Sequence, residues 1–218
     1  MKKTFLLSCL MLAAMPVMAA YTGHVYVDKN KNGVFDQSEK PLAGIKVSDG
    51  LNVVETAADG SFTLPGHERE RFIFITTPSG YKTFNRHYHK IEKKQSGYDF
   101  GLIPYSGRIR KDGSHRYIHI TDTEIFNTEN HADWVNNVRD YARNEQAAFI
   151  IHTGDICYEK GLKAHIKLMN TENMDCPVFY CIGNHDLVKG KYGEELFESI
   201  YGPVYYSCLL YTSPSPRD

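Results

Sequence analysis

Two stretches of the chain differ in how apolar and polar residues alternate. From residue 21 to residue 105, short segments such as 23–27 and 44–48 change character at every second position, and Asp-Gly pairs such as 49–50 stand between such segments. A period of two places every other side chain on one face of a strand, and Asp-Gly pairs are typical of tight turns. Closely spaced strands without a helical period are typical of a small β-sandwich, which we predict for residues 21–105.

Residues 115–207 follow a different pattern, in which longer apolar runs alternate with amphipathic segments. The runs are residues 117–121, 149–153 and 177–182. Residues 131–146, between the first two runs, carry apolar side chains at helical spacings of three and four. Alternating strands and helices predict an α/β domain with right-handed crossovers and a sheet covered by helices. Residues 106–114, with glycines and alternating charge, are the expected linker.

Each predicted strand of the second region is followed by polar side chains that can bind a metal. The residues are Asp122 and Glu124 after the first strand, Asp155 after the second, and Asn184, His185 and Asp186 after the third. If the strands are parallel neighbours, their carboxyl ends meet at one edge of the sheet, where open α/β folds keep their ligands. His119 and His152, within or beside strands, are expected to be core or supporting residues. The sequence therefore predicts a reaction site at this edge.

The motifs Asp122-Thr123-Glu124, Gly154-Asp155 and Gly183-Asn184-His185-Asp186, in this order, resemble the first three motifs of the calcineurin-like metallophosphoesterases. The resemblance implies that Asp122 binds one metal, Asp155 bridges two metals and Asn184 binds the second. It also implies that His185 is the acid for the leaving oxygen, held in place by Asp186. The family usually has a histidine where this chain has Glu124, which is either a metal ligand or an outer residue of the site.

The resemblance implies hydrolysis of phosphomonoesters or phosphodiesters with two divalent metal ions of the Mn, Fe or Zn type. The expected substrate is a phosphorylated small molecule or surface polymer. One alternative is a nucleotidase or sugar-nucleotide pyrophosphatase with the same metal core. The N-terminal region resembles the β domain of a secreted bacterial branch of the family and, more loosely, the repeat domains of surface adhesins. A secreted adhesin-like or binding module with a non-catalytic α/β domain is therefore a second alternative.

A loop in the N-terminal region matches the twelve-residue calcium-loop pattern. Oxygen-bearing side chains stand at positions 1, 3, 5, 9 and 12 of the loop, namely Asp28, Asn30, Asn32, Asp36 and Glu39, and Gly33 stands at position 6. A strand precedes the loop and Pro41 follows it, whereas an EF-hand has helices on both sides. Two interpretations stay open, a structural calcium ion or a hairpin loop that uses Asx turns and binds nothing.

The net charge and the N-terminal residues limit the partners and the location that we expect for this protein. The 218 residues carry a formal charge of -1, so no basic excess exists that would attract nucleic acid. Residues 1–20 have two lysines, an apolar run and small residues, which is the plan of a signal peptide. We expect export to the periplasm or the outside, with no transmembrane segment after cleavage. A lipoprotein signal acylated at Cys9 is the alternative, but few apolar residues precede Cys9.

The C-terminal part lacks what the resemblance leads one to expect. The family completes its site with a later lone histidine and a Gly-His-x-His motif, and no histidine follows Asp186. Residues 208–218 resemble the translation of a sequencing adapter. We therefore expect that natural sequence stops at Ser207, that residues 115–207 are the N-terminal half of a calcineurin-like phosphoesterase fold, and that this fragment is inactive.

Overall fold

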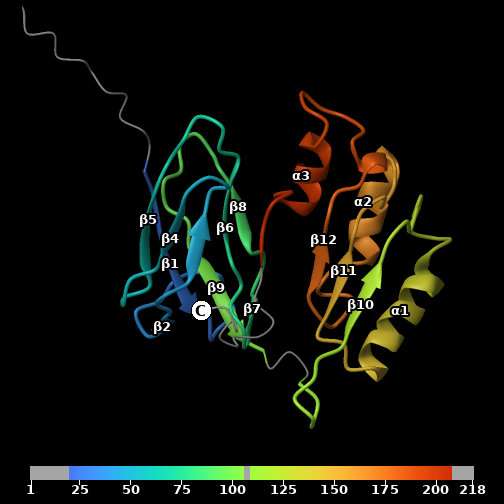
Figure 1. The fold of residues 1–218 in the computed structure, drawn as a ribbon, viewed down its shortest axis with the longest axis horizontal. Helices are drawn as coiled ribbons and strands as arrows, with labels where there is room; N and C mark the ends of the chain where they lie inside the picture. Colours follow the sequence, from blue (N-terminus) through green and yellow to red (C-terminus); the bar gives the residue numbers. More distant parts are fainter. Residues whose placement is uncertain (1–19, 106–108, 208–218) are drawn as a thin grey trace, which may run out of the picture.

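A computed structural model describes residues 20–105 and 109–207, which form two domains joined by a short connection (Figure 1). The predicted signal peptide, apart from Ala20, lies outside the described residues, and so do residues 106–108 of the predicted linker and the predicted tail 208–218. Among the described helices, none combines the length and the hydrophobicity that a membrane span requires.

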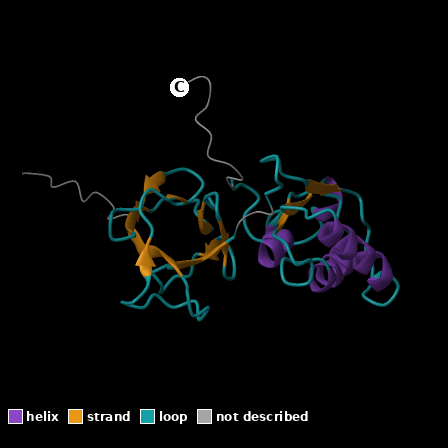
Figure 2. Cartoon of the chain, turned by 90° about the horizontal axis from the view of Figure 1, so that it is seen from below, coloured by secondary structure: helices purple, strands orange, loops and turns teal. Residues whose placement is uncertain are grey.

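The N-terminal domain is a β-sandwich of two sheets. Its strands are β1 (Ala20–Val27), β2 (Lys40–Pro41), β3 (Lys46–Ser48), β4 (Val53–Glu55), β5 (Ser61–Pro65), β6 (Phe72–Ile75), β7 (Tyr81–Thr83), β8 (Tyr88–Lys90) and β9 (Phe100–Pro104). One sheet has the order β2-β1-β9-β7, with β5 also paired to β1, and the other has the order β4-β3-β6-β8. Figure 2 shows these strands surrounding the interior of the domain.

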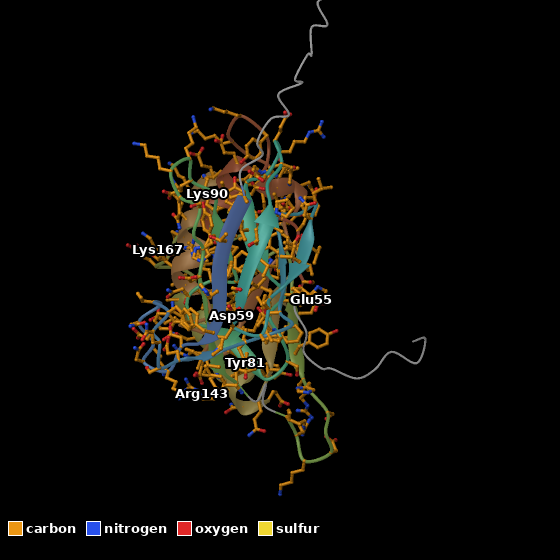
Figure 3. All side chains as sticks on the ribbon, turned by 90° about the vertical axis from the view of Figure 1, so that its left-hand side faces the viewer. Glu55, Asp59, Tyr81, Lys90, Arg143 and Lys167 are labelled. Atoms are coloured by element: carbon orange, nitrogen blue, oxygen red, sulfur yellow. The ribbon has the colours of Figure 1, made fainter. Side chains whose placement is uncertain are left out.

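The sandwich core follows from the alternation in the sequence. Val25, Leu64 and Leu102 of the first sheet and Val47 and Ile73 of the second are fully buried in one apolar cluster. Charged residues such as Glu55 and Asp59 stand on the surface of this domain (Figure 3). The apolar face of each sheet removes the other from water, and the predicted β-sandwich is confirmed.

The C-terminal domain is built on a parallel sheet with the order β10-β11-β12. Its elements are β10 (Tyr117–Ile120), α1 (Ala132–Asn144), β11 (Phe149–His152), α2 (Glu159–Leu168), β12 (Val178–Tyr180), the 3₁₀ helix η1 (Asn184–Asp186) and α3 (Glu195–Tyr201). Ile120 pairs with His152, and His152 pairs with Tyr180. The three strands therefore end level with one another, and the segments that follow them start from one edge.

Helices α1 and α2 pack on the same face of this sheet (Figures 1 and 2). Two crossovers of one hand that step in the same direction place their helices on the same side. The opposite face carries a row of aromatic rings, in which the Tyr117 and Phe149 centroids are 5.2 Å apart and the Phe149 and Phe179 centroids are 5.9 Å apart. Tyr117 keeps 60% of its surface exposed. The predicted α/β pattern is confirmed, and its helical cover is found on one face.

The two domains contact each other through charged and aromatic side chains. Arg71 of the β domain donates to the buried carboxylate of Glu198 in α3 over 2.7 Å, and its guanidinium lies 4.7 Å from the centre of the Tyr192 ring. The Tyr105 hydroxyl donates to the carbonyl oxygen of Ala148 over 2.9 Å. These contacts connect β6 and the end of β9 to the α/β domain.

Candidate active site

The edge at which β10, β11 and β12 end gathers the polar motifs. The amide of Asp122 donates to the Gly154 carbonyl over 3.2 Å, which joins the segment after β10 to the segment after β11. The amide of His185 donates to Asp155 Oδ1 over 3.0 Å, which joins β11 to η1. His185 Nδ1 lies 3.6 Å from Glu124 Oε1. The structure therefore brings together residues from all three motifs, as the parallel order requires.

The backbone is strained where the carboxylates stand. Asp122, Glu124 and Asp155 have φ angles of +52°, +43° and +48°. Within the described residues, six non-glycine residues have a positive φ, and half of them are these three. Such conformations cost free energy and persist where the surrounding structure enforces them, which happens most often at functional sites. The three strained residues are all acidic residues of the sequence motifs.

Glycine is required where the ends of β11 and β12 meet. Gly154 has φ of +104°, and a Cβ on it would lie 2.6 Å from the amide nitrogen of Gly183. A Cβ on Gly183 would overlap the backbone nitrogen of Asp155. The two strand ends thus approach more closely than any side chain allows. This close approach places the Asp155 carboxylate against the start of η1.

Asp186 takes different partners from those expected. Its buried carboxylate accepts hydrogen bonds from the amides of Gly183 at 2.9 Å, Ile156 at 2.9 Å and Cys157 at 3.1 Å. Burial raises the pKa of Asp186, while the three amide hydrogen bonds oppose that shift. The described contacts of Asp186 do not include the His185 ring, so the expectation that Asp186 holds His185 needs correction. Asp186 instead ties the turn after β11 to the turn after β12.

His185 is placed by other neighbours. Its ring stacks on Tyr158, with centroids 5.0 Å apart and 23° between the planes. Its Nδ1 atom is shielded from solvent and has no hydrogen-bond partner among the described residues, and the carboxylate that faces it belongs to Glu124. Glu124 is therefore the acidic neighbour of the His185 ring. Tyr158 belongs to none of the sequence motifs and was not predicted as a site residue.

His152 supports the segment that carries Asp122 and Glu124. Its ring is buried, and its Nδ1 accepts from the amide of Gly154 at 3.3 Å. Burial lowers the pKa of His152 to about 4, so the ring is neutral near pH 7. The proton then lies on Nε2, which is 2.9 Å from Thr123 Oγ1 and donates to it. His152 was expected to be a core or supporting residue, and the structure confirms this. Thr123, which the sequence interpretation left aside, stands between two acidic residues of the site.

The donors at this edge are suited to divalent metal ions. Carboxylate oxygens come from Asp122, Asp155 and Glu124, and an amide oxygen comes from Asn184. Oxygen donors suit hard and borderline divalent ions. Asp122, Glu124 and Asn184 are exposed, so an ion from solution can reach them.

A cavity of about 720 Å³ lies away from this edge, between the two domains. Its walls include His87 and Tyr88 from the β domain and Phe179 and Tyr180 from β12, and none of the motif residues lines it. The cavity therefore plays no part in the site built from the three motifs.

The predicted calcium loop closes on itself. Asp28 accepts hydrogen bonds from the amides of Asn32 and Gly33 at 3.2 and 2.9 Å, and Glu39 accepts from the amides of Lys29 and Asp36 at 2.9 and 3.1 Å. The side-chain amides of Asn30 and Asn32 donate to Asp36 Oδ2. Asp28 and Glu39 are buried, so both ends of the loop turn their carboxylates inward. This geometry is compatible with both interpretations of the loop.

Comparison with known protein families gave matches to both domains. A family model described as the N terminal of calcineurin-like phosphoesterase matches residues 29–104, and the model described as calcineurin-like phosphoesterase matches residues 115–214. The second match extends into the segment that was predicted to be foreign. A search of curated proteins gave no match. Members of this family bind divalent metals and hydrolyse phosphate esters. The chain therefore belongs to the calcineurin-like phosphoesterases and carries their N-terminal β-rich domain ahead of the phosphoesterase domain.

Proposed function

We propose that the protein hydrolyses phosphomonoesters or phosphodiesters at a dinuclear metal centre on the edge formed by β10, β11 and β12. One observation carries this proposal, namely that acidic residues from separate motifs meet at one edge with strained backbones. Asp122, Glu124 and Asp155 all have positive φ, and Asp155 also accepts from the amide of His185. Three strained acidic residues that meet at one edge of a sheet support a role in chemistry.

The side chains divide the work of holding metal and substrate. Asp155 lies between the other two motifs and would bridge two ions, Asp122 would hold the first ion and Asn184 the second. Ions of the Mn, Fe or Zn type would polarise the phosphoryl oxygens and lower the pKa of a bound water. Gly154 and Gly183 keep the space between the strand ends free of side chains, and His152 fixes the segment that holds Asp122.

His185 is the proposed proton donor to the leaving oxygen. The Glu124 carboxylate lies 3.6 Å from its Nδ1, and Tyr158 fixes the plane of the ring. In this assignment Glu124 replaces Asp186 as the acidic neighbour of His185. Asp186 contributes by holding the two turns in place.

The substrate class and the location are part of the proposal. A phosphorylated small molecule or surface polymer would reach an exported enzyme, and the leader pattern in residues 1–20 supports export. A nucleotidase or sugar-nucleotide pyrophosphatase would use the same ligands, so a panel of nucleotides, sugar nucleotides and simple phosphate esters separates these activities. An adhesin-like or binding function predicts no turnover with any of them.

The assay uses p-nitrophenyl phosphate and bis-p-nitrophenyl phosphate with Mn²⁺, Fe²⁺ or Zn²⁺. We expect slow activity that requires added metal and falls to background in Asp155→Asn, since a bridging ligand is lost. Asp175→Asn is the control, because Asp175 is an aspartate that also has a positive φ, of +60°, but belongs to no motif. Equal activity of the Asp155 and Asp175 variants would contradict the proposal.

Low activity of the 218-residue chain is also proposed. No histidine follows Asp186, so the chain offers few nitrogen ligands for two ions. We expect weak metal binding and slow turnover. Resequencing of the source DNA beyond the codon for Ser207 tests the cause: a frame that continues into a lone histidine and Gly-His-x-His supports the proposal. Rapid turnover with two tightly bound ions in the present chain would contradict it.

In the N-terminal domain the loop from Asp28 to Glu39 is proposed to bind a structural Ca²⁺ ion. Its buried, inward-facing carboxylates support this choice. The expected result is a higher melting temperature in Ca²⁺ than in EGTA, lost in Asp28→Asn. An identical melting temperature in both conditions would assign the loop to Asx turns alone.

A further inference from the structure

A second group of metal-binding side chains lies in the β domain. Asp49 is in the turn between β3 and β4, whereas His67 and Glu70 are in the loop between β5 and β6. One ligand atom from each of the three residues lies within 4.8 Å of those of the other two. Among the described residues, this is the one group of three or more His, Cys, Asp or Glu residues whose ligand atoms lie this close together. None of the sequence motifs includes these residues.

The nitrogen of this group is enclosed and lacks a partner. His67 Nε2 is shielded from solvent and makes no hydrogen bond to any described residue. It lies 3.5 Å from Asp49 Oδ1, beyond a good hydrogen bond, and the side chain of Asp49 is fully buried. Leaving a buried polar atom without a partner costs about 1–3 kcal/mol. A ligand that occupies the space beside Nε2 would remove this cost.

The charge around the nitrogen favours a cation. Glu70 accepts hydrogen bonds from the hydroxyl of Tyr21 and from the backbone amide of His67. Two carboxylates therefore converge in a partly enclosed place, where a positive ion would be strongly stabilised.

One contact must change when an ion binds. The amide of Arg69 donates to His67 Nδ1 over 3.2 Å, so in the neutral ring the proton lies on Nε2. Coordination through Nε2 moves that proton to Nδ1, and the Arg69 amide must then turn away from the ring. Arg69 is exposed, so its amide can bond to water instead. The Arg69 amide is thus a local reporter of metal binding.

We propose that Asp49, His67 and Glu70 bind one divalent transition-metal ion of the Zn²⁺ class. One imidazole nitrogen and two carboxylate oxygens suit Zn²⁺, with water as the fourth ligand. The ion would join the turn between β3 and β4 to the loop between β5 and β6. The role is structural, because binding to the folded state alone stabilises that state.

The test measures Zn²⁺ binding by a parent chain that carries Asp122→Asn and Asp155→Asn. These two substitutions reduce metal binding at the proposed phosphoesterase site, so that the site in the β domain can be measured separately. Calorimetry and metal analysis after gel filtration should give one bound Zn²⁺ per chain. His67→Gln should weaken this binding by about tenfold or more, as expected when a ligand is lost. His24→Gln is the matched control, since His24 Nδ1 lies 3.4 Å from Asp99 Oδ1 in a similar pair without a third ligand. It should bind Zn²⁺ as the parent does.

Two further measurements distinguish a loss of metal binding from a folding defect of the variants. Melting in EDTA should be similar for the parent and for Glu70→Gln, while Zn²⁺ should raise the melting temperature of the parent alone. Zn²⁺ should also shift the amide resonance of Arg69. Absence of bound Zn²⁺ in the parent, or binding that His67→Gln leaves unchanged, would overturn the proposal.

Discussion

The two domains treat their acidic residues in opposite ways. In the β domain, Asp28, Glu39 and Asp49 are buried and accept hydrogen bonds from backbone amides of their own turns. In the α/β domain, Asp122 and Glu124 are exposed on a strained backbone. The buried carboxylates hold turns in place, and an ion bound among them would add to that structural role, whereas the exposed and strained carboxylates are open to both ions and substrates. The comparison indicates that the β domain supplies structure and the edge of the α/β domain supplies chemistry.

The largest effect is expected from Gly154→Ala, which would break the close approach of β11 and β12. The new Cβ would meet the Gly183 backbone at 2.6 Å, and φ is +104°. We expect a loss of more than about 2 kcal/mol in the free energy of unfolding, measured in urea. Gly80→Ala is the control, because Gly80 has φ of +82° but a Cβ there meets nothing within 4 Å. Its loss of stability measures the cost of the positive φ angle alone. Equal losses in both variants would remove the argument for a required contact.

Acid should destabilise the α/β domain through a buried histidine of α2. Burial lowers the pKa of His165 to about 3, and its Nε2 has no hydrogen-bond partner among the described residues. Because the pKa of His165 is lower in the folded protein than in the unfolded chain, the unfolded chain binds more protons between these two pKa values. The contribution of the neutral ring to the free energy of unfolding is therefore complete above about pH 6.5 and falls as the pH drops from there towards 3. The α/β domain should lose a few kcal/mol over this range, and His165→Phe should flatten the slope. A slope unchanged by the substitution would contradict this assignment.

The contact between the domains depends on a buried charge. Arg71→Met leaves Glu198 without its guanidinium, and we expect a loss of about 1 kcal/mol, since Tyr192 still donates to Glu198 and Arg71 is partly exposed. Lys46→Met, which breaks the exposed pair with Glu55, should cost less than about 0.5 kcal/mol. Urea unfolding of both variants measures the difference. A larger loss for Lys46→Met would reverse the ranking.

At His152 the effect to measure is the change in metal binding. His152→Gln can keep one hydrogen bond to Thr123 and should bind Mn²⁺ more tightly than His152→Ala, which keeps none. His119→Ala is the control, because His119 is exposed and bonds to Thr153 outside the motifs. Calorimetry with Mn²⁺ makes the comparison. Identical affinities for the two His152 variants would mean that the ring acts by packing alone.

The sequence predicted the features that depend on local order along the chain. Strand periodicity and the polar residues after each strand were enough to place Asp122 and Asp155 at one edge. The partners of Asp186 could not be predicted, since its hydrogen bonds depend on how residues 156–157 cross the end of β12. The same holds for Asp49 and His67, which meet only because two separate turns fold to the same end of the sandwich.

The central claim is a dinuclear centre bridged by Asp155, and electron paramagnetic resonance with Mn²⁺ tests it most directly. At saturating Mn²⁺ we expect the signal of two exchange-coupled ions in the parent and in Asp175→Asn. Asp155→Asn should show isolated ions or none, because the bridging carboxylate is lost. An exchange-coupled signal that survives Asp155→Asn, or isolated ions alone in the parent at saturation, would contradict the account.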